Sequence, residues 1–298
     1  MYLSIITINY NNAEGLRKTL ASVASQTYAE IEHIIIDGGS KDNSVEVIRA
    51  YESSLASRLC GVPENARGDL GCSSPLASRL KWISEKDSGI YNAMNKGIRM
   101  ANGEYIEILN SGDILSNANV TQRMIEYLEQ INSQQKEPVG ILYGNMIKVN
   151  GLGQVVGKSG YTEYSLRQFY NSTLNHDCAY IRKDLFEEYG LYDENLKIVS
   201  DWKWYLQAIG LGRVKPEYVD IDVTIFDDEG ISETNLELRN KERRQVLEEL
   251  LPPAVLWDYD THAFEMEQMN RLRRWKLYPV VYFMERVCFK FENWFCKR

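Results

Sequence analysis

Short apolar runs alternate with amphipathic segments along the first part of this chain. The runs 3–9, 31–36 and 104–109 are mostly apolar and alternate little, as parallel strands buried on both faces of a sheet do. Segments 13–26 and 90–101 instead carry apolar residues at helical spacing. Strands and helices that alternate in this way predict an α/β fold built on a doubly wound sheet.

The later part of the chain repeats both patterns less regularly. Further strands are predicted at 81–85, 139–149, 154–157, 178–181 and 218–226, and further helices at 42–51, 120–131, 183–189, 201–209 and 235–251. Residues 53–80 interrupt the order, and SSLASRL at 53–59 nearly recurs as SSPLASRL at 73–80. We expect this stretch to be a solvent-exposed loop insertion with a local duplication.

Acidic side chains follow three of the predicted strands. Asp37 comes directly after the run 31–36, Asp87 follows a short strand, and Asp113 lies in the loop after the next strand. Ligands of open parallel sheets bind beyond the carboxyl ends of the strands. Carboxylates at these ends therefore predict a site for a nucleotide and a cation.

The composition narrows the class of protein. A formal net charge of −8 argues against general binding of nucleic acid. The five cysteines contain no CxxC pair, which fits a reducing cytosol better than a disulfide framework. The chain begins without a basic region followed by a long apolar stretch, and no apolar run is long enough to cross a membrane. We therefore expect a cytoplasmic protein.

Residues 271–298 differ from the rest of the chain. They hold eight Lys or Arg against two Glu, a balance of +6 in an otherwise acidic sequence. From Leu277 onward apolar residues recur at helical spacing, with aromatic residues beside them. A basic, aromatic, amphipathic helix suits peripheral contact with an anionic membrane. Packing of the same stripe on the catalytic domain or on a second subunit is an equally open alternative.

Six stretches of the chain together resemble glycosyltransferase family 2. They are, in order, SIITINYNN, HIIIDGGSKDNS, SEKDSGIYNAMNKGI, GEYIEILNSGD, NHDCAYIRKDLF and LYDENLKIVSDWKW. The resemblance covers roughly residues 1–230 and implies a GT-A fold, with one Rossmann-like, doubly wound mixed sheet as the catalytic domain. It also implies inverting transfer of a sugar from a nucleotide-diphosphate sugar, usually with Mg²⁺ or Mn²⁺. Residues 231–298 would then form a C-terminal helical extension.

The resemblance also assigns roles to individual residues. The donor would be bound by residues at the strand ends and on the central helix, namely Thr7, Asn9, Tyr10, Asp37, Asp87, Asn95, Asn110 and Ser111. Asp113 matches the last acidic position of the metal motif, Asp201 matches the general base, and His176 would contact the diphosphate or the acceptor. The sequence departs from the family at 110–113, where one carboxylate stands in place of two or three. Metal affinity would then depend on the phosphates of the donor.

Each of these assignments has a structural alternative. Asp37 and Asp87 could shape the turns before helices, as Asp often does. Asp113 and Asp201 could cap the helices that follow them. His176 could be a hydrogen-bonded structural residue.

The sequence therefore predicts an inverting glycosyltransferase that uses a nucleotide sugar, with a UDP-sugar favoured. Its acceptor would be a glycan or a lipid-linked acceptor in surface polysaccharide synthesis, at the inner face of the cytoplasmic membrane. The alternative from another class is a catalytically silent nucleotide-sugar-binding scaffold, which the single carboxylate at 110–113 favours. A nucleotidyltransferase is a weaker alternative, because the segment after the first strand offers little Gly-rich basic sequence for a triphosphate.

Overall fold

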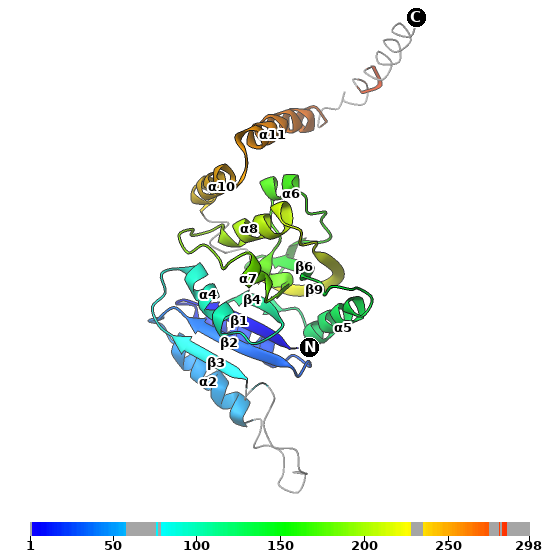
Figure 1. The fold of residues 1–298 in the computed structure, drawn as a ribbon. Helices are drawn as coiled ribbons and strands as arrows, with labels where there is room; N and C mark the ends of the chain where they lie inside the picture. Colours follow the sequence, from blue (N-terminus) through cyan, green and yellow to red (C-terminus); the bar gives the residue numbers. More distant parts are fainter. Residues whose placement is uncertain are drawn as a thin grey trace, which may run out of the picture. The chain divides into compact units, whose positions relative to one another are not determined.

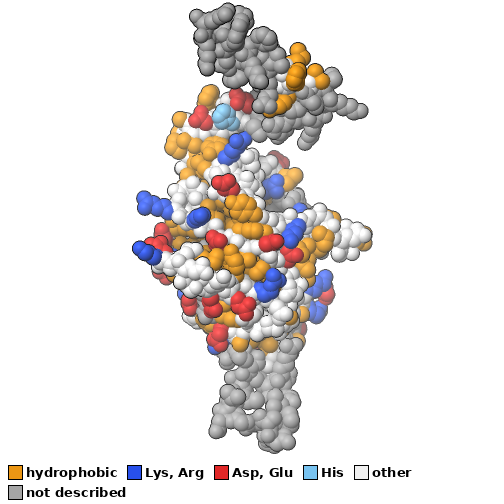
Figure 2. All heavy atoms as spheres, turned by 90° about the vertical axis from the view of Figure 1, so that its right-hand side faces the viewer, with side chains coloured by type: hydrophobic (Ala, Val, Ile, Leu, Met, Phe, Trp, Pro, Cys, Tyr) orange, Lys and Arg blue, Asp and Glu red, His pale blue; other side chains and the backbone are white. Residues whose placement is uncertain are grey.

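The computed structural model describes residues 2–57, 76, 79–227, 235–273, 280 and 282–284. The chain divides into two compact units, Met1–Arg243 and Arg244–Arg298. Within the described residues, no helix has both the length and the apolar character needed to cross a membrane. Acidic, basic and apolar side chains are intermixed on the face of the described residues that Figure 2 shows.

One mixed sheet organises the first unit (Figure 1). Its strand order is β3-β2-β1-β4-β8-β6-β9-β5, and β7 pairs with β6 outside this path. The strands are β1 (Leu3–Asn9), β2 (Ile31–Asp37), β3 (Leu80–Ser84), β4 (Tyr105–Asn110), β5 (Ile114–Leu115), β6 (Ile141–Val149), β7 (Val155–Lys158), β8 (Ala179–Arg182) and β9 (Glu217–Asp227).

The strands β3, β2, β1 and β4 run parallel, and this half of the sheet matches the apolar runs of the sequence. All residues of β1 and β2 are buried, as the absence of polar alternation predicts. The register pairs Asn9 with Asp37, and Ile8 with Asn110, so the carboxyl ends of β1, β2 and β4 lie at one edge. The sheet therefore brings the predicted donor residues together.

The other half of the sheet is mixed. The strand β8 runs antiparallel to both β4 and β6, and β9 then runs parallel to β6. Because β8 is antiparallel to both β4 and β6, the strands β6 and β9 run in the same direction as β4. Their carboxyl ends therefore lie at the edge where the site is expected. The short β5, which follows Asp113 directly, pairs antiparallel with β9.

Helices cover both faces of the sheet. The first unit contains α1 (Ala13–Ala24), α2 (Ser44–Ser57), α4 (Ile90–Met100), α5 (Val120–Asn132), α6 (Leu166–Asn171), α7 (Leu185–Glu188) and α8 (Ser200–Tyr205), with a 3-10 turn η2 (His176–Cys178) and a π-helical turn η3 (Leu206–Leu211). The helices α1 and α2 pack together over Ile35, whereas Gly97 of α4 lies against Ile6 of β1. Ile5 of β1 belongs to the α5 core instead. Because neighbouring residues of a strand point to opposite faces, α4 covers the face opposite to α5.

Two further helices follow β9. They are α10 (Leu236–Leu250) and α11 (Pro253–Arg273). Within the second unit, the Arg244 guanidinium donates from Nη1 to both carboxylate oxygens of Asp260 at 3.0 and 2.8 Å, which joins α10 to α11.

The doubly wound mixed sheet is confirmed, and several local predictions need revision. Residues 53–57, expected in a loop, complete α2, because Leu55 is buried in the core between α1 and α2. The remainder of the expected insertion, apart from Leu76 and the residues from Arg79 onward, lies outside the described residues. The helices α6 and α11 and the strand β5 were not predicted. Most of the basic tail 271–298 also lies outside the described residues.

Candidate active site

Asp37, at the end of β2, is held by four protein donors. Asn9 Nδ2 donates to its Oδ1 at 2.8 Å, and Ser84 Oγ donates to its Oδ2 at 2.6 Å. Ser40 donates from its hydroxyl at 2.5 Å and from its backbone N–H at 3.0 Å. Burial alone would raise the pKa of Asp37, but these hydrogen bonds lower it by a larger amount. The pKa is therefore below its usual value, and the carboxylate stays ionised. It ties β1, β2 and β3 together at the edge of the site.

Thr7 and Tyr10, at the end of β1, differ in exposure. Thr7 is fully buried, and its Oγ1 lies 3.0 Å from His33 Nε2, whose other ring nitrogen lies 3.0 Å from Tyr51 Oη. Tyr10 is 64% exposed. Of these two predicted donor-binding residues, only Tyr10 presents its side chain to solvent.

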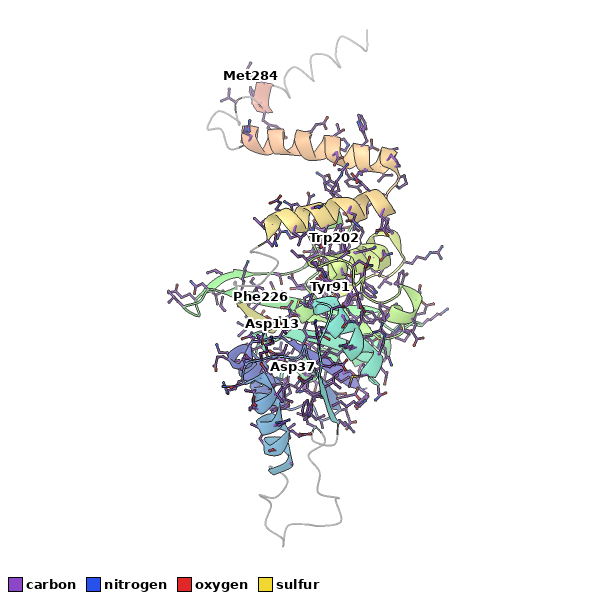
Figure 3. The ribbon with its side chains drawn as sticks, turned by 90° about the vertical axis from the view of Figure 1, so that its left-hand side faces the viewer. Asp37, Tyr91, Asp113, Trp202, Phe226 and Met284 are labelled. Carbon is purple, nitrogen blue, oxygen red and sulfur yellow. The ribbon has the colours of Figure 1, made fainter. Side chains whose placement is uncertain are left out.

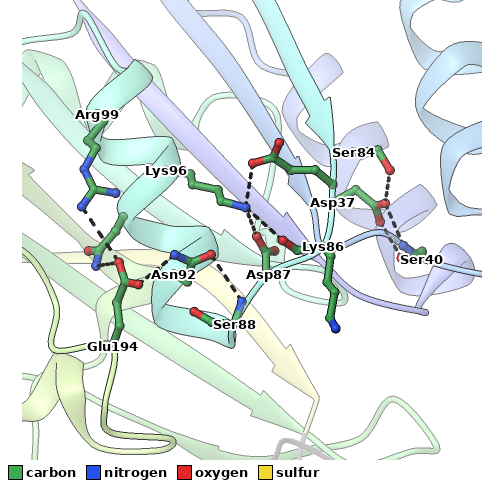
Figure 4. A network of polar contacts seen from close by, with 12 residues as sticks. Asp37, Ser40, Ser84, Lys86, Asp87, Ser88, Asn92, Lys96, Arg99 and Glu194 are labelled. Atoms are coloured by element: carbon green, nitrogen blue, oxygen red, sulfur yellow. Dashed lines mark hydrogen bonds and ion pairs between the residues drawn. The ribbon is translucent and has the colours of Figure 1, made fainter.

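Asp87 and Lys96 form an ion pair at the start of α4 (Figure 4). Lys96 Nζ also contacts Glu85 Oε1 at 2.8 Å, so one ammonium group serves two carboxylates. A Cβ added to Gly38 would lie 3.0 Å from Asp87 Oδ2, which shows how closely the turn after β2 approaches this carboxylate. Asp87 and Asp37 therefore line one edge, and a lysine neutralises one of them.

Asn95 fixes the loop that leads to α8. Its Nδ2 donates to Tyr192 O and to Glu194 Oε1, both at 2.9 Å, and its Oδ1 accepts from Tyr192 N at 3.0 Å. Asn92 Nδ2 donates to the other Glu194 oxygen at 2.8 Å (Figure 4). Asn95 is 1% exposed, and each of its polar side-chain atoms is bonded to the protein, so its role is to hold this loop.

The loop after β4 presents one buried carboxylate. Asp113 Oδ2 accepts from the backbone N–H of Asn110 at 3.2 Å and from its Nδ2 at 3.0 Å. Burial and the neighbouring Asp177 carboxylate raise the pKa of Asp113 to about 7. Asn110 Oδ1 is buried without a hydrogen-bond partner. Ser111 accepts from Asn12 Nδ2 through its carbonyl oxygen, which anchors this loop to the start of α1.

Asp201, at the second residue of α8, receives a hydrogen bond on each carboxylate oxygen. Tyr91 Oη donates to Oδ1 at 2.8 Å, and His176 Nδ1 donates to Oδ2 at 3.3 Å. His176 Nε2 lies 3.2 Å from Asn110 Nδ2, so His176 contacts both Asp201 and the loop that carries Asp113. Figure 3 labels Asp113 in this loop and Tyr91, the second hydrogen-bond partner of Asp201.

Burial alone would raise the pKa of Asp201, but the hydrogen bond and charge of His176 and the hydrogen bond of Tyr91 lower it. Burial lowers the pKa of His176, yet its bond to Asp201 and the surrounding carboxylates raise it to about 9. The two side chains therefore form an ion pair near neutral pH. Asp201 does not cap its helix, since α8 begins at Ser200 with Val199 as its cap residue.

The residue after Asp201 anchors the helix in the core. Trp202 is 2% exposed, its Nε1 donates to Phe169 O at 2.8 Å, and Arg243 lies over its ring at 4.8 Å from the centroid. Glu242 accepts from the backbone N–H groups of Lys197 and Ile198 at 2.7 and 2.9 Å, which holds the turn before α8. These contacts fix where Asp201 points.

Known proteins with this sequence pattern are glycosyltransferases. The family description Glycosyl transferase family 2 matches residues 4–71. An uncharacterised glycosyltransferase of Mycobacterium tuberculosis is 34% identical over 210 residues, which cover 69% of this chain and 68% of the relative. The chain belongs to glycosyltransferase family 2. A PGL/p-HBAD biosynthesis glycosyltransferase of Mycobacterium bovis is 23% identical over 227 residues, or 76% of this chain and 77% of the relative.

Solved structures confirm the predicted GT-A fold of this family 2 glycosyltransferase. S. aureus TarS 1–349 in complex with UDP-GlcNAc matches with a TM-score of 0.57 and 18% identity, over 78% of this chain and 61% of that one. Mannosyltransferase PcManGT from Pyrobaculum calidifontis, in complex with GDP-Man and Mn²⁺, matches with a TM-score of 0.55 and 15% identity, over 95% and 84%. A longer TarS structure is matched over only 41% of its length.

The structure brings most of the residues that the family resemblance assigned to one edge of the sheet. Asn9, Asp37 and Asp87 lie at the ends of β1 to β3, and Asp113 and Asp201 are joined through Asn110 and His176. The donor, metal and base roles themselves remain predictions.

Sequence reasoning missed the partners of these residues. Tyr91, Lys96, Asp177 and Glu194 each contact or influence a predicted residue through the fold. Tyr91 and Lys96 lie five residues apart on α4, but spacing alone does not show which loops they contact.

Proposed function

We propose that this glycosyltransferase transfers a sugar from a UDP-sugar to a hydroxyl of a glycan or lipid-linked acceptor, with inversion at the anomeric carbon. The observation that carries the proposal is Asp201, a half-buried carboxylate held on both oxygens by Tyr91 and His176. Inverting transfer needs one base that takes the proton of the acceptor hydroxyl as that hydroxyl attacks. The lowered pKa of Asp201 keeps it ionised for this role.

The donor would lie along the ends of β1, β2 and β3. Carboxylates accept hydrogen bonds from the N–H groups of a base and from ribose hydroxyls. Asp87 and Tyr10 are placed for such contacts, because Asp87 lines the turn after β2 and Tyr10 is exposed beside it. Asp37 has four protein donors already, so its direct contact with a base would require one of them to move. TarS, a fold relative, has been solved with UDP and with UDP-GlcNAc, which supports testing UDP first.

A divalent cation fits the loop 110–113. The buried carboxylate of Asp113 and the unpartnered Oδ1 of Asn110 are both hard oxygen ligands of the kind that Mg²⁺ and Mn²⁺ prefer. No group of three or more His, Cys, Asp or Glu side chains able to hold a metal occurs in the part of the chain that the structure describes. We therefore propose that donor phosphates and water complete the coordination. The bound cation would stabilise the leaving diphosphate.

His176 would act between these two groups. Its raised pKa makes it a cation that pairs directly with Asp201, and its ring lies against the Asn110 side chain of the Asp113 loop. A positive charge at this point favours a developing diphosphate and keeps the base ionised. We retain a diphosphate or acceptor contact for His176, and a cytoplasmic place of action where nucleotide sugars are made.

The test combines nucleotide titration with two variants. Calorimetric titration of UDP, GDP, CDP and dTDP, with and without Mn²⁺, should show UDP binding that depends on Mn²⁺ and that Asp113→Ala abolishes. Asp201→Asn should bind UDP normally but hydrolyse and transfer UDP-sugars roughly 10² to 10⁴ times more slowly. Asp184→Asn, in the exposed ion pair with Arg182, is the matched control and should keep full activity.

Two outcomes would overturn the proposal. Absence of nucleotide binding with any metal would refute the donor site. Full activity of Asp201→Asn would refute the assignment of the base. A wild type that binds UDP with Mn²⁺ but consumes no UDP-sugar would instead favour the catalytically silent scaffold.

A further inference from the structure

Four tyrosines pack ring to ring on the half of the sheet that the donor residues do not use. This tyrosine cluster consists of Tyr143 on β6, Tyr218 on β9, and Tyr161 and Tyr164 between β7 and α6. Tyr161 meets Tyr218 edge-on with the ring centroids 5.6 Å apart. Tyr143 contacts both Tyr218, at 5.4 Å, and Tyr164, at 5.5 Å. Edge-to-face and tilted pairs of this kind hold each ring in a defined orientation.

The cluster is buried at one end and open at the other. Tyr143 is 3% exposed, whereas Tyr161 is 69% exposed and Tyr218 is half-buried. The outer ring therefore has one edge packed and most of its surface in solvent. An aromatic ring that is held in one orientation and open to solvent offers a surface on which the apolar face of a ligand can pack.

Polar side chains surround the open rings in fixed positions. Tyr218 Oη donates to Asn145 Oδ1 at 2.9 Å, and Asn145 Nδ2 donates to Asp220 Oδ1 at 2.8 Å and to Asp222 Oδ1 at 3.1 Å. Lys158 Nζ pairs with Asp222 at 2.6 Å. The side chain of Asp220 is 79% exposed, so its carboxylate can accept further hydrogen bonds.

The cluster is joined to the candidate base through packed groups. Tyr164 stacks on Phe169 with the centroids 5.3 Å apart and an interplanar angle of 30°. The carbonyl oxygen of Phe169 accepts from Trp202 Nε1 at 2.8 Å, and Trp202 directly follows Asp201. The cluster thus lies on the side of Asp201 that α6, β6 and β9 form, whereas the predicted donor residues lie on β1 to β4.

We propose that the open face of the tyrosine cluster binds a sugar ring of the acceptor, so that the acceptor of this enzyme carries a saccharide. The proposal rests on the proposed transferase function, because it assigns the cluster to the acceptor that Asp201 would deprotonate. A sugar ring has an apolar face of C–H groups that packs on an aromatic ring and an edge of hydroxyls that donate to carboxylates. Tyr161 offers the first surface, and the exposed carboxylate of Asp220 offers the second.

The charges around the cluster favour a saccharide over a lipid surface. Asp220 and Asp222 flank Tyr218, and Lys158 balances only one of them at close range. An anionic membrane would be repelled by this acidic rim, whereas neutral hydroxyl groups would be bound by it. The same carboxylates would repel the diphosphate of a donor.

Tyr161→Ala and Asp220→Asn test the proposal. The probes are an array of defined oligosaccharides, and vesicles of phosphatidylglycerol as the lipid alternative, both presented to the Asp201→Asn protein with UDP and Mn²⁺. We expect saccharides to bind and vesicles not to bind. Adding Tyr161→Ala should weaken saccharide binding on the order of three- to tenfold, since one oriented ring contact is lost. Both changed side chains are exposed, so the fold should be retained.

Trp257→Ala, which removes an aromatic ring that is 67% exposed on α11, is the matched control and should leave saccharide binding unchanged. Hydrolysis of UDP-sugar in the absence of acceptor separates this proposal from the proposed function. Tyr161→Ala should retain that hydrolysis. If the wild type neither hydrolyses UDP-sugar nor binds UDP, the transferase assignment is refuted, and that result does not bear on the tyrosine cluster. Saccharide binding that is absent in the parent protein, or unchanged by Tyr161→Ala, would overturn the proposal, as would vesicle binding that Tyr161→Ala abolishes.

Discussion

His33 links a predicted donor residue to the hydrophobic core, and its state should control the pH dependence of stability. The ring is fully buried between Thr7 Oγ1 and Tyr51 Oη, each 3.0 Å from a ring nitrogen. Two hydroxyl groups satisfy a neutral imidazole, which has one donor and one acceptor. Burial lowers the pKa of His33 from 6.5 to about 3, because a charged ring would lose its hydration.

The sign and size of the effect follow from this shift. The unfolded chain takes up a proton near pH 6.5, while the folded chain resists protonation of His33 until about pH 3. Stability is therefore retained above pH 6.5 and falls as the pH drops from 6.5 toward 3. At pH 5.0, which is 1.5 units below the unfolded pKa, the loss is about 2 kcal/mol, and below pH 3 it reaches about 5 kcal/mol.

Urea denaturation at pH 7.5 and pH 5.0 measures this term. His33→Gln lowers stability at both values but lacks the titrating ring, so between the two pH values it should lose about 2 kcal/mol less than the wild type. The difference between the proteins removes the contribution of carboxylates that titrate in both. His262→Gln, in the exposed pair with Glu265, is the control and should follow the wild type closely. Equal pH dependence of the wild type and His33→Gln would refute the reasoning.

Two further predictions concern α4. Tyr91→Phe removes one hydrogen bond from Asp201, so the pKa of Asp201 should rise and the acidic limb of the kcat/KM profile should move to higher pH, with UDP affinity unchanged. An unmoved profile would contradict this role. Gly97→Ala places a Cβ 2.4 Å from Ile6 Cγ2. Overpacking costs about 1–3 kcal/mol against a helix-propensity gain of about 1 kcal/mol, so the urea midpoint should fall; a raised midpoint would contradict the contact.

The parallel half of the sheet could be predicted from the sequence because burial on both faces leaves a clear pattern. The runs 3–9 and 31–36 are mostly apolar, and β1 and β2 match them within one residue. The helix α11 was not predicted, because two consecutive prolines, Pro252 and Pro253, usually indicate that the preceding helix ends. Pro253 instead starts the next one, at the first position where its fixed φ and missing N–H do no harm. The strand β5, with two residues, carries no periodicity to detect.

The site was predictable only as a set of positions. The motifs indicated Asp37, Asp113 and Asp201, because each follows a strand or opens a helix in a familiar order. Their partners come from segments far away in the chain: Tyr91 meets Asp201 across 110 positions, and Asn9 meets Asp37 across 28. Such contacts depend on strand order and on the path of loops, neither of which a local pattern contains.

The electrostatics of the four acidic positions distinguish one of them. Asp37 has four hydrogen-bond donors, Asp87 has Lys96, and Asp201 has His176 and Tyr91. Asp113 instead lies beside a second buried carboxylate, Asp177, and its pKa is raised rather than held low. A carboxylate in that environment is stabilised most by an added cation. Protein groups therefore compensate the charge of three of these carboxylates. The charge of the fourth, Asp113, would be compensated by a metal ion bound together with the donor diphosphate. The position that the family resemblance assigns to the metal is this fourth one, and the two arguments are independent.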